Sequence, residues 1–339
     1  MSRISISLAV LSLAGAGIFA GCGLLTDDDA PINFYESGVI TFSRYEYPHH
    51  SLIGLDLASR EETVLADTLG WDVAWAPDGE RIAFTAYLWD SPIGGPTVDD
   101  VGPEVFEMDL LTKEWRIVSP VIDRPWGPGS TGPYYNPVWS PDGNRIAYTR
   151  CGGHGGPCHI RIAASDGANG YTEEIVIPAD YVPTSHLLDW SPDGGSILLE
   201  SDPDGSFPYH KNVYQVELST LDRELVLAAD STFIIRGARY SPRGDRIAFI
   251  AYTNGKTEIY TAGVDGSNVR PLTDNSLTER SLAWSPDGKV LSFSASDSGE
   301  DERQSHIYIM ETRPGAPAER VTTTEASYYD HEWRPVPRR

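Results

Sequence analysis

The sequence predicts an all-β fold, a six-bladed β-propeller of four-stranded antiparallel blades. A phrase of one aromatic residue followed by Ser/Ala-Pro-Asp-Gly recurs along the chain, and an apolar alternation such as Ile82-Ala-Phe84 follows the copies. Neighbouring copies are 44 to 64 residues apart, which is room for four strands and their turns but not for a separate domain. Five copies, one of them altered, begin at Trp75, Trp139, Trp190, Tyr240 and Trp284, and a truncated sixth begins at Trp333.

Each copy combines a tight turn with an aromatic residue suited to a core. Proline at the second turn position restricts φ, aspartate can accept a hydrogen bond within the turn, and glycine tolerates the left-handed conformation. We therefore expect each copy to join the first and second strands of a blade. Aromatic residues at equivalent positions of a repeat are expected to fill the gaps between neighbouring blades rather than to form ligand platforms.

The two ends of the chain are expected to share one blade. Only six residues follow Trp333, too few for three more strands. Residues 38–43 match the second strand of the repeat, and residues 52–57 and 62–65 match the third and fourth. Pairing these N-terminal strands with the Trp333 strand completes the sixth blade and leaves no free sheet edge at the junction.

The repeat resembles the TolB-type propeller repeat, a WD-like family common in bacterial envelope proteins. The resemblance rests on Trp-Ser-Pro-Asp-Gly with its Arg-Ile-Ala-Phe continuation, and it covers residues 38–335. Two features depart from the family. Tyr240 and Arg243 replace the usual Trp and Asp of one blade, and only a short tail precedes the first strand where TolB carries an α/β domain. Partners that TolB engages through that domain are therefore not implied for this chain.

The N-terminus has the layout of a secretory signal. Residues 1–21 carry one basic residue and then an apolar run that is short for a membrane span. The ending Phe19-Ala-Gly-Cys22 resembles a bacterial lipoprotein box, so we expect Cys22 to receive lipid; ordinary signal cleavage after Ala16 is the alternative. Residues 22–36 then form the lipidated cysteine and an acidic tether, and residues 37–339 form the propeller. We expect an outer-membrane lipoprotein facing the periplasm or the cell surface.

Two cysteines remain once Cys22 is assigned. Cys151 and Cys158 bracket a glycine-rich stretch between two predicted strands, so they are expected to face each other across a hairpin. In an oxidising compartment a disulfide is the simple interpretation. The alternative is a metal site that adds His154 and His159, although this spacing matches no zinc pattern.

The chain is strongly acidic, with a net charge of −23. Such a surface repels nucleic acid and anionic lipid headgroups, so nucleic acid is excluded as a partner and the lipid anchor is the expected membrane contact. We expect a monomer without cofactor or metal, whose partner is an envelope protein, a peptide or a glycan.

The long, irregular loops are expected on one face of the disc, opposite the Pro-Asp-Gly turns, and binding sites are usually placed on such loops. Aligning the blades on their aromatic residue places one residue per blade four positions earlier, where each inner strand begins. Aromatic, histidine and arginine side chains there suit an anionic or aromatic ligand, such as a peptide carboxylate or an acidic sugar. The alternative is pairing of each residue with a neighbouring carboxylate. The six are Trp71, Tyr135, His186, Arg236, Arg280 and Tyr329.

No catalytic residue is predicted, because the sequence has no Gly-x-Ser-x-Gly elbow and no hydrolase domain after the repeats. We expect a non-enzymatic binding or scaffold module. The alternative is a metal-dependent polysaccharide (uronate) lyase or glycan hydrolase, since propeller lyases with similar repeats hold a metal with a histidine cluster. Scattered surface histidines explain the pattern more simply. Five histidines map to the loop-bearing face: His49, His50, His186, His210 and His331.

Overall fold

A computed structural model describes most of the region in which the propeller was predicted. The signal segment 1–21, Cys22 and the rest of the 22–36 tether lie outside the described residues, so these remain predictions. In the part of the chain that is described, no helix is long and apolar enough to span a membrane. The described residues are 38–46, 49–67, 71–86, 103–119, 131–152, 158–165, 171–177, 186–201, 211–297, 305–323 and 327–336.

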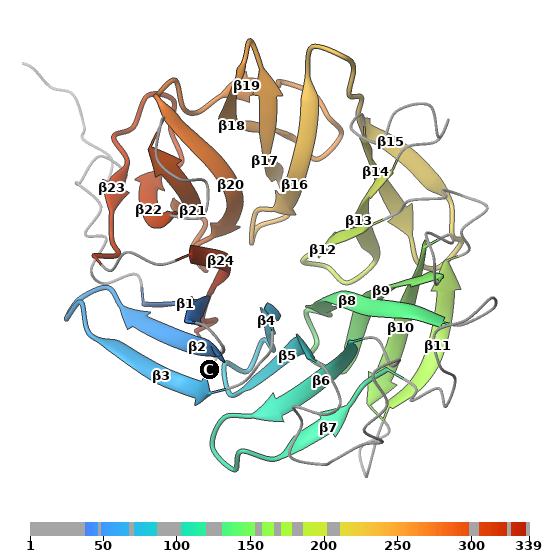
Figure 1. Ribbon diagram of the computed structural model, residues 1–339. Coiled ribbons are helices and arrows are strands. Elements are labelled where there is room, and N and C mark those ends of the chain that lie inside the picture. Colours follow the sequence, from blue (N-terminus) through green and yellow to red (C-terminus); the bar gives the residue numbers. More distant parts are fainter. Residues whose placement is uncertain are drawn as a thin grey trace, which may run out of the picture. The chain divides into compact units, whose positions relative to one another are not determined.

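The described strands form six four-stranded antiparallel sheets, which are the six predicted blades (Figure 1). Each blade is named below with its innermost strand first. Blade 1 is β4 (Trp71–Trp75), β5 (Arg81–Ala86), β6 (Glu104–Asp109) and β7 (Trp115–Ile117); blade 2 is β8 (Thr131–Trp139), β9 (Arg145–Gly152), β10 (Cys158–Ser165) and β11 (Tyr171–Ile177). Blade 3 is β12 (His186–Trp190), β13 (Ser196–Ser201), β14 (Asn212–Glu217) and β15 (Arg223–Leu227); blade 4 is β16 (Ile234–Tyr240), β17 (Arg246–Thr253), β18 (Lys256–Gly263) and β19 (Arg270–Pro271). Blade 5 is β20 (Leu277–Trp284), β21 (Val290–Asp297), β22 (His306–Glu311) and β23 (Glu319–Arg320); the closing blade is β24 (Ser327–Trp333), β1 (Val39–Glu46), β2 (His49–Asp56) and β3 (Glu62–Asp67).

The closing blade joins the two ends of the chain, as predicted. Its strand order is β24-β1-β2-β3, so the red C-terminal strand pairs with the first blue strand in Figure 1. Trp333 stands opposite Ile40 in this antiparallel pair. The backbone amide of Arg334 donates to the carbonyl oxygen of Val39 at 2.8 Å and extends the pairing beyond the strand. Ring closure therefore depends on residues from both ends of the propeller.

The Pro-Asp-Gly turns have the predicted conformation. In blade 2 the amide of Gly143 donates to the carbonyl of Ser140 at 2.9 Å, and Gly143 has a φ of +71°. The Asp142 carboxylate accepts from the Ser140 hydroxyl at 2.5 Å, which fixes the turn from within. The prolines of the five turns, together with Pro335 of the truncated copy, line one cavity of about 640 Å³, so the turns lie on a common face, the turn face: Pro77, Pro141, Pro192, Pro242, Pro286 and Pro335.

The aromatic residues of the repeat are buried between blades, as expected. Trp139 of blade 2, for example, packs in one core cluster with Ala74 and Ala83 of blade 1. The structure also gives a role to the arginine of Arg-Ile-Ala-Phe, which stacks its guanidinium on the aromatic ring of the next blade. The distances from guanidinium carbon to ring centroid are 4.7 Å for Arg81 and Trp139, 5.0 Å for Arg145 and Trp190, and 5.3 Å for Arg246 and Trp284. The motif therefore encodes contacts between blades as well as the turn.

Bulges in the inner strands bring further polar contacts between blades. A shift in pairing register occurs in β4, β8, β12, β16 and β20, a few residues before the aromatic position, and in the pairing of β24 with β1. At these bulges a carboxylate often accepts from a backbone amide of the following blade. Asp189 accepts from the amide of Tyr240 at 2.7 Å, and Glu332 accepts from the amide of Trp75 at 3.2 Å. Glu332 also lines the cavity at the centre of the ring, where the candidate site lies.

Candidate functional site

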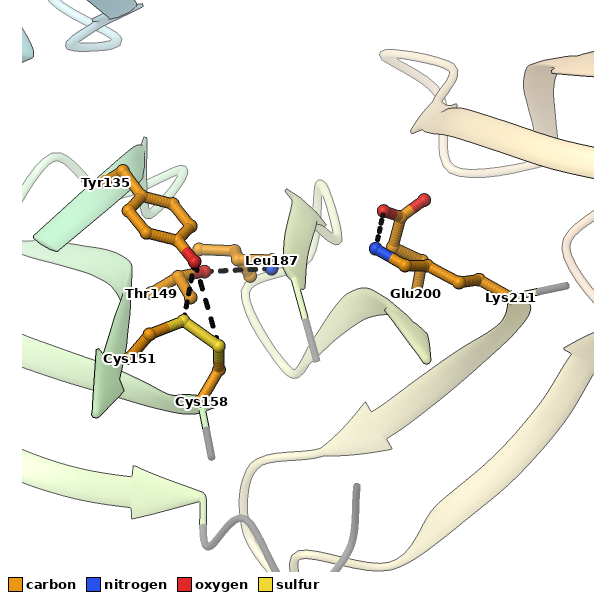
Figure 2. Close-up of a disulfide and its surroundings, with 7 residues drawn as sticks. All are labelled: Tyr135, Thr149, Cys151, Cys158, Leu187, Glu200 and Lys211. Carbon is orange, nitrogen blue, oxygen red and sulfur yellow. Dashed lines mark hydrogen bonds and ion pairs between the residues drawn. A yellow bond between two sulfur atoms is a disulfide. The ribbon is translucent and has the colours of Figure 1, made fainter. Parts of the chain in front are cut away.

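The inner strands surround a cavity of about 500 Å³, which we call the channel cavity. The six inner strands contact one another in order around the ring. The cavity lies toward the ends of the strands where the long loops were predicted, because its walls include residues near the start of the inner strands. Glu200 and Lys211, on either side of the loop between β13 and β14, complete this wall and form an ion pair at 3.0 Å (Figure 2). The lining residues that stand three or four positions before the aromatic residue of their blade include Asp72, Asn136, Leu187, Arg236, Arg280 and Asp330.

Two aspartates from neighbouring blades meet in the wall of the channel cavity. Asp330 of β24 accepts a hydrogen bond from the backbone amide of Asp72 of β4 at 3.4 Å. The Asp72 carboxylate in turn accepts from the amide of Asn136 and from the hydroxyl of Thr85, both at 3.2 Å. Asp72, Asn136 and Asp330 all have a positive φ, of 53°, 54° and 21° respectively. This unusual backbone directs the two carboxylates toward each other at the blade junction.

Burial raises the pKa values of three carboxyl groups on the inner strands. Burial and the facing charge of Asp330 raise the pKa of Asp72 to about 8, against the opposing hydrogen bond from the amide of Asn136. Burial also raises the pKa of Glu332 to about 7 and that of Asp189 to about 6, although the nearby Arg239 guanidinium opposes both shifts. At neutral pH Asp72 therefore holds a proton that an exposed carboxyl group would have lost.

The raised pKa values predict a loss of stability as the pH increases. A carboxyl group with a pKa of about 8 in the folded protein and about 4 in the unfolded chain stabilises the fold most below pH 4, and this contribution decreases up to pH 8. Burial lowers the pKa of His331 to about 4, so this residue makes the fold more stable as the pH increases toward 6.5. The effect of Asp72 is therefore best measured above pH 6.5. Between pH 6.5 and pH 8.5 we expect a loss of about 1–2 kcal/mol and a decrease in melting temperature.

Melting curves of the wild type and of Asp72→Asn, recorded across this pH window, test the assignment. Asparagine keeps an oxygen for the Asn136 amide but does not titrate, so the variant should show a clearly shallower pH dependence. Equal slopes for the two proteins would show that Asp72 is not the group responsible.

The residues predicted to ring the channel mouth are only partly brought together. Arg236 and Arg280 both line the channel cavity and are exposed in it. Trp71 lines an adjoining cavity of about 440 Å³, the side cavity, which Arg280 also borders. Tyr135 turns its hydroxyl toward the sulfur atoms of Cys151 and Cys158 (Figure 2). The side chains of His186 and Tyr329 lie outside the described part of the structure.

Asp72 and Asp330 were not among the site residues predicted from the sequence. They stand three positions before the aromatic residue of the repeat, whereas the predicted residues stand four positions before it. A signal was present, because the third positions of four blades carry Asp72, Asn136, Gly237 and Asp330. These are residue types that tolerate a left-handed backbone, and all four have a positive φ.

The structure joins the sulfur atoms of Cys151 and Cys158. That this disulfide forms in the mature protein stays a prediction. They stand opposite each other on β9 and β10, with Cα atoms 3.8 Å apart (Figure 2). The bond ties the two strands together where they reach the loop-bearing end. A bonded pair has no thiolate to offer a metal, so the alternative metal site with His154 and His159 is not supported.

The histidine cluster of the lyase alternative also lacks support. His331 was expected on the loop-bearing face, but its side chain is buried, with Nδ1 3.0 Å from the hydroxyl oxygen of Ser281 in blade 5. The side chains of His49, His50, His186 and His210 are outside the described part of the structure. Within that part, no three histidine, cysteine, aspartate or glutamate side chains come close enough to hold a metal ion.

Comparisons with known proteins agree with this geometry. No protein-family model matches the chain. The Tol-Pal system protein TolB of Sodalis glossinidius is 32% identical over 126 residues, which is 35% of this chain and 26% of the relative. The crystal structure of TolB from Acinetobacter baumannii matches 88% of this chain and 67% of that chain, with a TM-score of 0.66 and 17% identity. This chain is a TolB-like six-bladed β-propeller.

The same fold occurs in an enzyme. The structure of an oligogalacturonate lyase in complex with manganese matches 84% of this chain and 74% of that chain, with a TM-score of 0.53 and 14% identity. At this identity the likeness concerns the fold alone, because propellers host unrelated functions on similar backbones. A lyase role would therefore need support from the site residues. The described residues of this chain include no metal-holding group, so they do not favour the lyase alternative.

Proposed function

We propose that this TolB-like propeller is a non-enzymatic binding module of the bacterial cell envelope that receives a protein or peptide at the channel cavity. The observation that carries the proposal is the pair Arg236 and Arg280, exposed in the wall of one cavity on neighbouring inner strands β16 and β20. Guanidinium groups bind carboxylates in a bidentate manner, and two of them can hold an anionic group in a chain whose net charge of −23 otherwise repels it.

The comparisons support the envelope part of the proposal. The matched relative is named as a protein of the Tol-Pal system, although the match spans only 26% of its length. We therefore propose that this chain is located in the cell envelope and that its partner is an envelope protein. The finer location, an outer-membrane lipoprotein exported through residues 1–21, is part of the proposal and rests on the sequence alone.

The two arginines provide the test of the binding role. A double Arg236→Ala, Arg280→Ala variant should bind envelope proteins captured by the wild type at least about a hundredfold more weakly, because each charge-assisted contact contributes about 1.5–3 kcal/mol. The measurement is capture from envelope extracts, followed by titration of the captured protein. Arg243→Ala is a matched control, because Arg243 is an exposed arginine in a turn of the turn face. Equal binding by all three proteins would reject the channel cavity as the docking site.

Lipid anchoring at Cys22 is tested separately. A Cys22→Ser variant should lose metabolic labelling with fatty acid and should leave the membrane fraction, because the serine cannot accept the thioether-linked lipid. A wild-type protein that is already unlabelled and soluble would exclude the anchor and favour ordinary cleavage after Ala16.

A further inference from the structure

The channel cavity and the side cavity adjoin each other and differ in character. They share Arg280, Ser281 and Asp330 in their walls. The channel cavity, of about 500 Å³, is lined mainly by charged and polar groups near its mouth. The side cavity, of about 440 Å³, is bordered by the rings of Trp71 and Tyr328. A single ligand can therefore place a polar part in one cavity and an apolar part in the other.

The charges of the channel cavity are separated around the ring. Arg236 and Arg280 stand on β16 and β20, and the two aspartates stand on the next two inner strands, Asp330 on β24 and Asp72 on β4. Lys211, which pairs with Glu200, and Arg239 line the same cavity. One side of the cavity thus favours an anion and the adjacent side favours a cation.

The aspartate pair is suited to an ammonium group. Burial and the charge of Asp330 keep a proton on Asp72 at neutral pH, and a cation bound between the two carboxyl groups displaces this proton because it removes the repulsion between them. Within the described residues no third metal-ligating side chain joins the pair, so an ammonium with its three donors fits better than a metal ion. Trp71 is half-buried and Tyr328 is buried, which gives the side cavity an aromatic wall against which an apolar side chain can pack.

We propose that the two cavities together bind an α-amino acid or a dipeptide as a zwitterion, with its carboxylate at Arg236 and Arg280, its ammonium at Asp72 and Asp330, and an apolar or aromatic side chain beside Trp71. This inference deepens the proposed function and rests on the same binding site. The combined volume accommodates such a small ligand, and the polar groups converge from four blades, as in ligand pockets generally.

Four small probes test the assignment on the intact protein by calorimetry. Phenylalanine and alanyl-phenylalanine carry both charges and distinguish a free amino acid from a dipeptide. N-acetyl-phenylalanine lacks the ammonium and phenylalaninamide lacks the carboxylate. We expect at least one of the two zwitterions to bind. N-acetyl-phenylalanine and phenylalaninamide should each bind at least about tenfold more weakly than phenylalanine, because each lacks one charge-assisted hydrogen bond.

Variants assign the contacts. Asp72→Asn should weaken zwitterion binding at least about tenfold yet leave the affinity for N-acetyl-phenylalanine unchanged, a pattern that a general loss of structure would not produce. If Asp72→Asn does not fold, Asp330→Asn serves the same purpose. Trp71→Leu should reduce the ligand-induced change in tryptophan fluorescence, and Arg243→Gln on the turn face should change nothing.

Two results would overturn the inference. One is equal binding of phenylalanine and N-acetyl-phenylalanine, and the other is no binding of either zwitterion at about 1 mM. Neither result by itself rejects the proposed function, which fails only if the Arg236→Ala, Arg280→Ala variant captures envelope proteins as well as the wild type does.

Discussion

Deleting residues 330–339 is expected to abolish cooperative folding of the propeller. The deletion removes Trp333, a 5% exposed core residue, together with Asp330 and Glu332, which accept hydrogen bonds from blade 1. Loss of a buried tryptophan alone costs about 3–5 kcal/mol, and a whole domain has a net stability of only about 5–15 kcal/mol. The closing blade would also lose its inner strand and expose the edge of β1. Circular dichroism melting and gel filtration should show a non-cooperative, aggregating protein.

A chain ending at Val336 is the matched control, because it keeps every described contact of β24. Among these contacts, Arg334 donates from Nε to the carbonyl oxygen of Gly79 at 2.9 Å and stacks over Trp75 at 5.4 Å. This control should melt like the full chain. If the 330–339 deletion also stays monomeric with an unchanged melting temperature, the closing blade does not depend on β24, and the pairing of the two ends is wrong.

Local turn chemistry allowed most of the fold to be predicted from the sequence. Each Pro-Asp-Gly copy specifies a hairpin within a few residues, and its spacing specifies a four-stranded blade. The closing blade was also predictable, because residues 38–65 supplied the three strands of the repeat that the Trp333 copy needs to form a blade. Both features depend on residues that are close in sequence or on a simple count of strands.

The candidate site was predicted less completely because its contacts join blades that are distant in sequence. Asp72 and Asp330 are 258 positions apart, and no local pattern indicates that they meet. The same reason explains His331, which was expected on the loop-bearing face but packs against Ser281 of blade 5. Arg236 and Arg280 could be found by aligning the repeats, because both stand four positions before the aromatic residue of their copy. A contact between residues at different positions of two repeats can be found only from the three-dimensional ring.

Blades 3 and 4 approach each other closely at Gly266, and this contact can be tested by replacing the glycine. Gly266 lies in the turn between β18 and β19, and its amide donates to the carbonyl of Gly263 at 2.9 Å. A Cβ at this position would lie 1.9 Å from the carbonyl oxygen of Val226, which belongs to β15 of the neighbouring blade. Because that oxygen is backbone, the two blades must separate to accept any side chain. The close approach is therefore expected to be essential for packing of blade 4 on blade 3.

Gly266→Ala should destabilise the propeller by about 2–5 kcal/mol, the sum of a left-handed backbone cost of about 1–2 kcal/mol and an overpacking cost of about 1–3 kcal/mol. Gly255→Ala isolates the first contribution, because Gly255 has a similar φ of +86° against +77° but no atom within 4 Å of its added Cβ. Urea unfolding should place the midpoint of Gly266→Ala clearly below that of Gly255→Ala. Coincident midpoints would mean that backbone strain accounts for the whole effect and that blades 3 and 4 are not in tight contact at the rim.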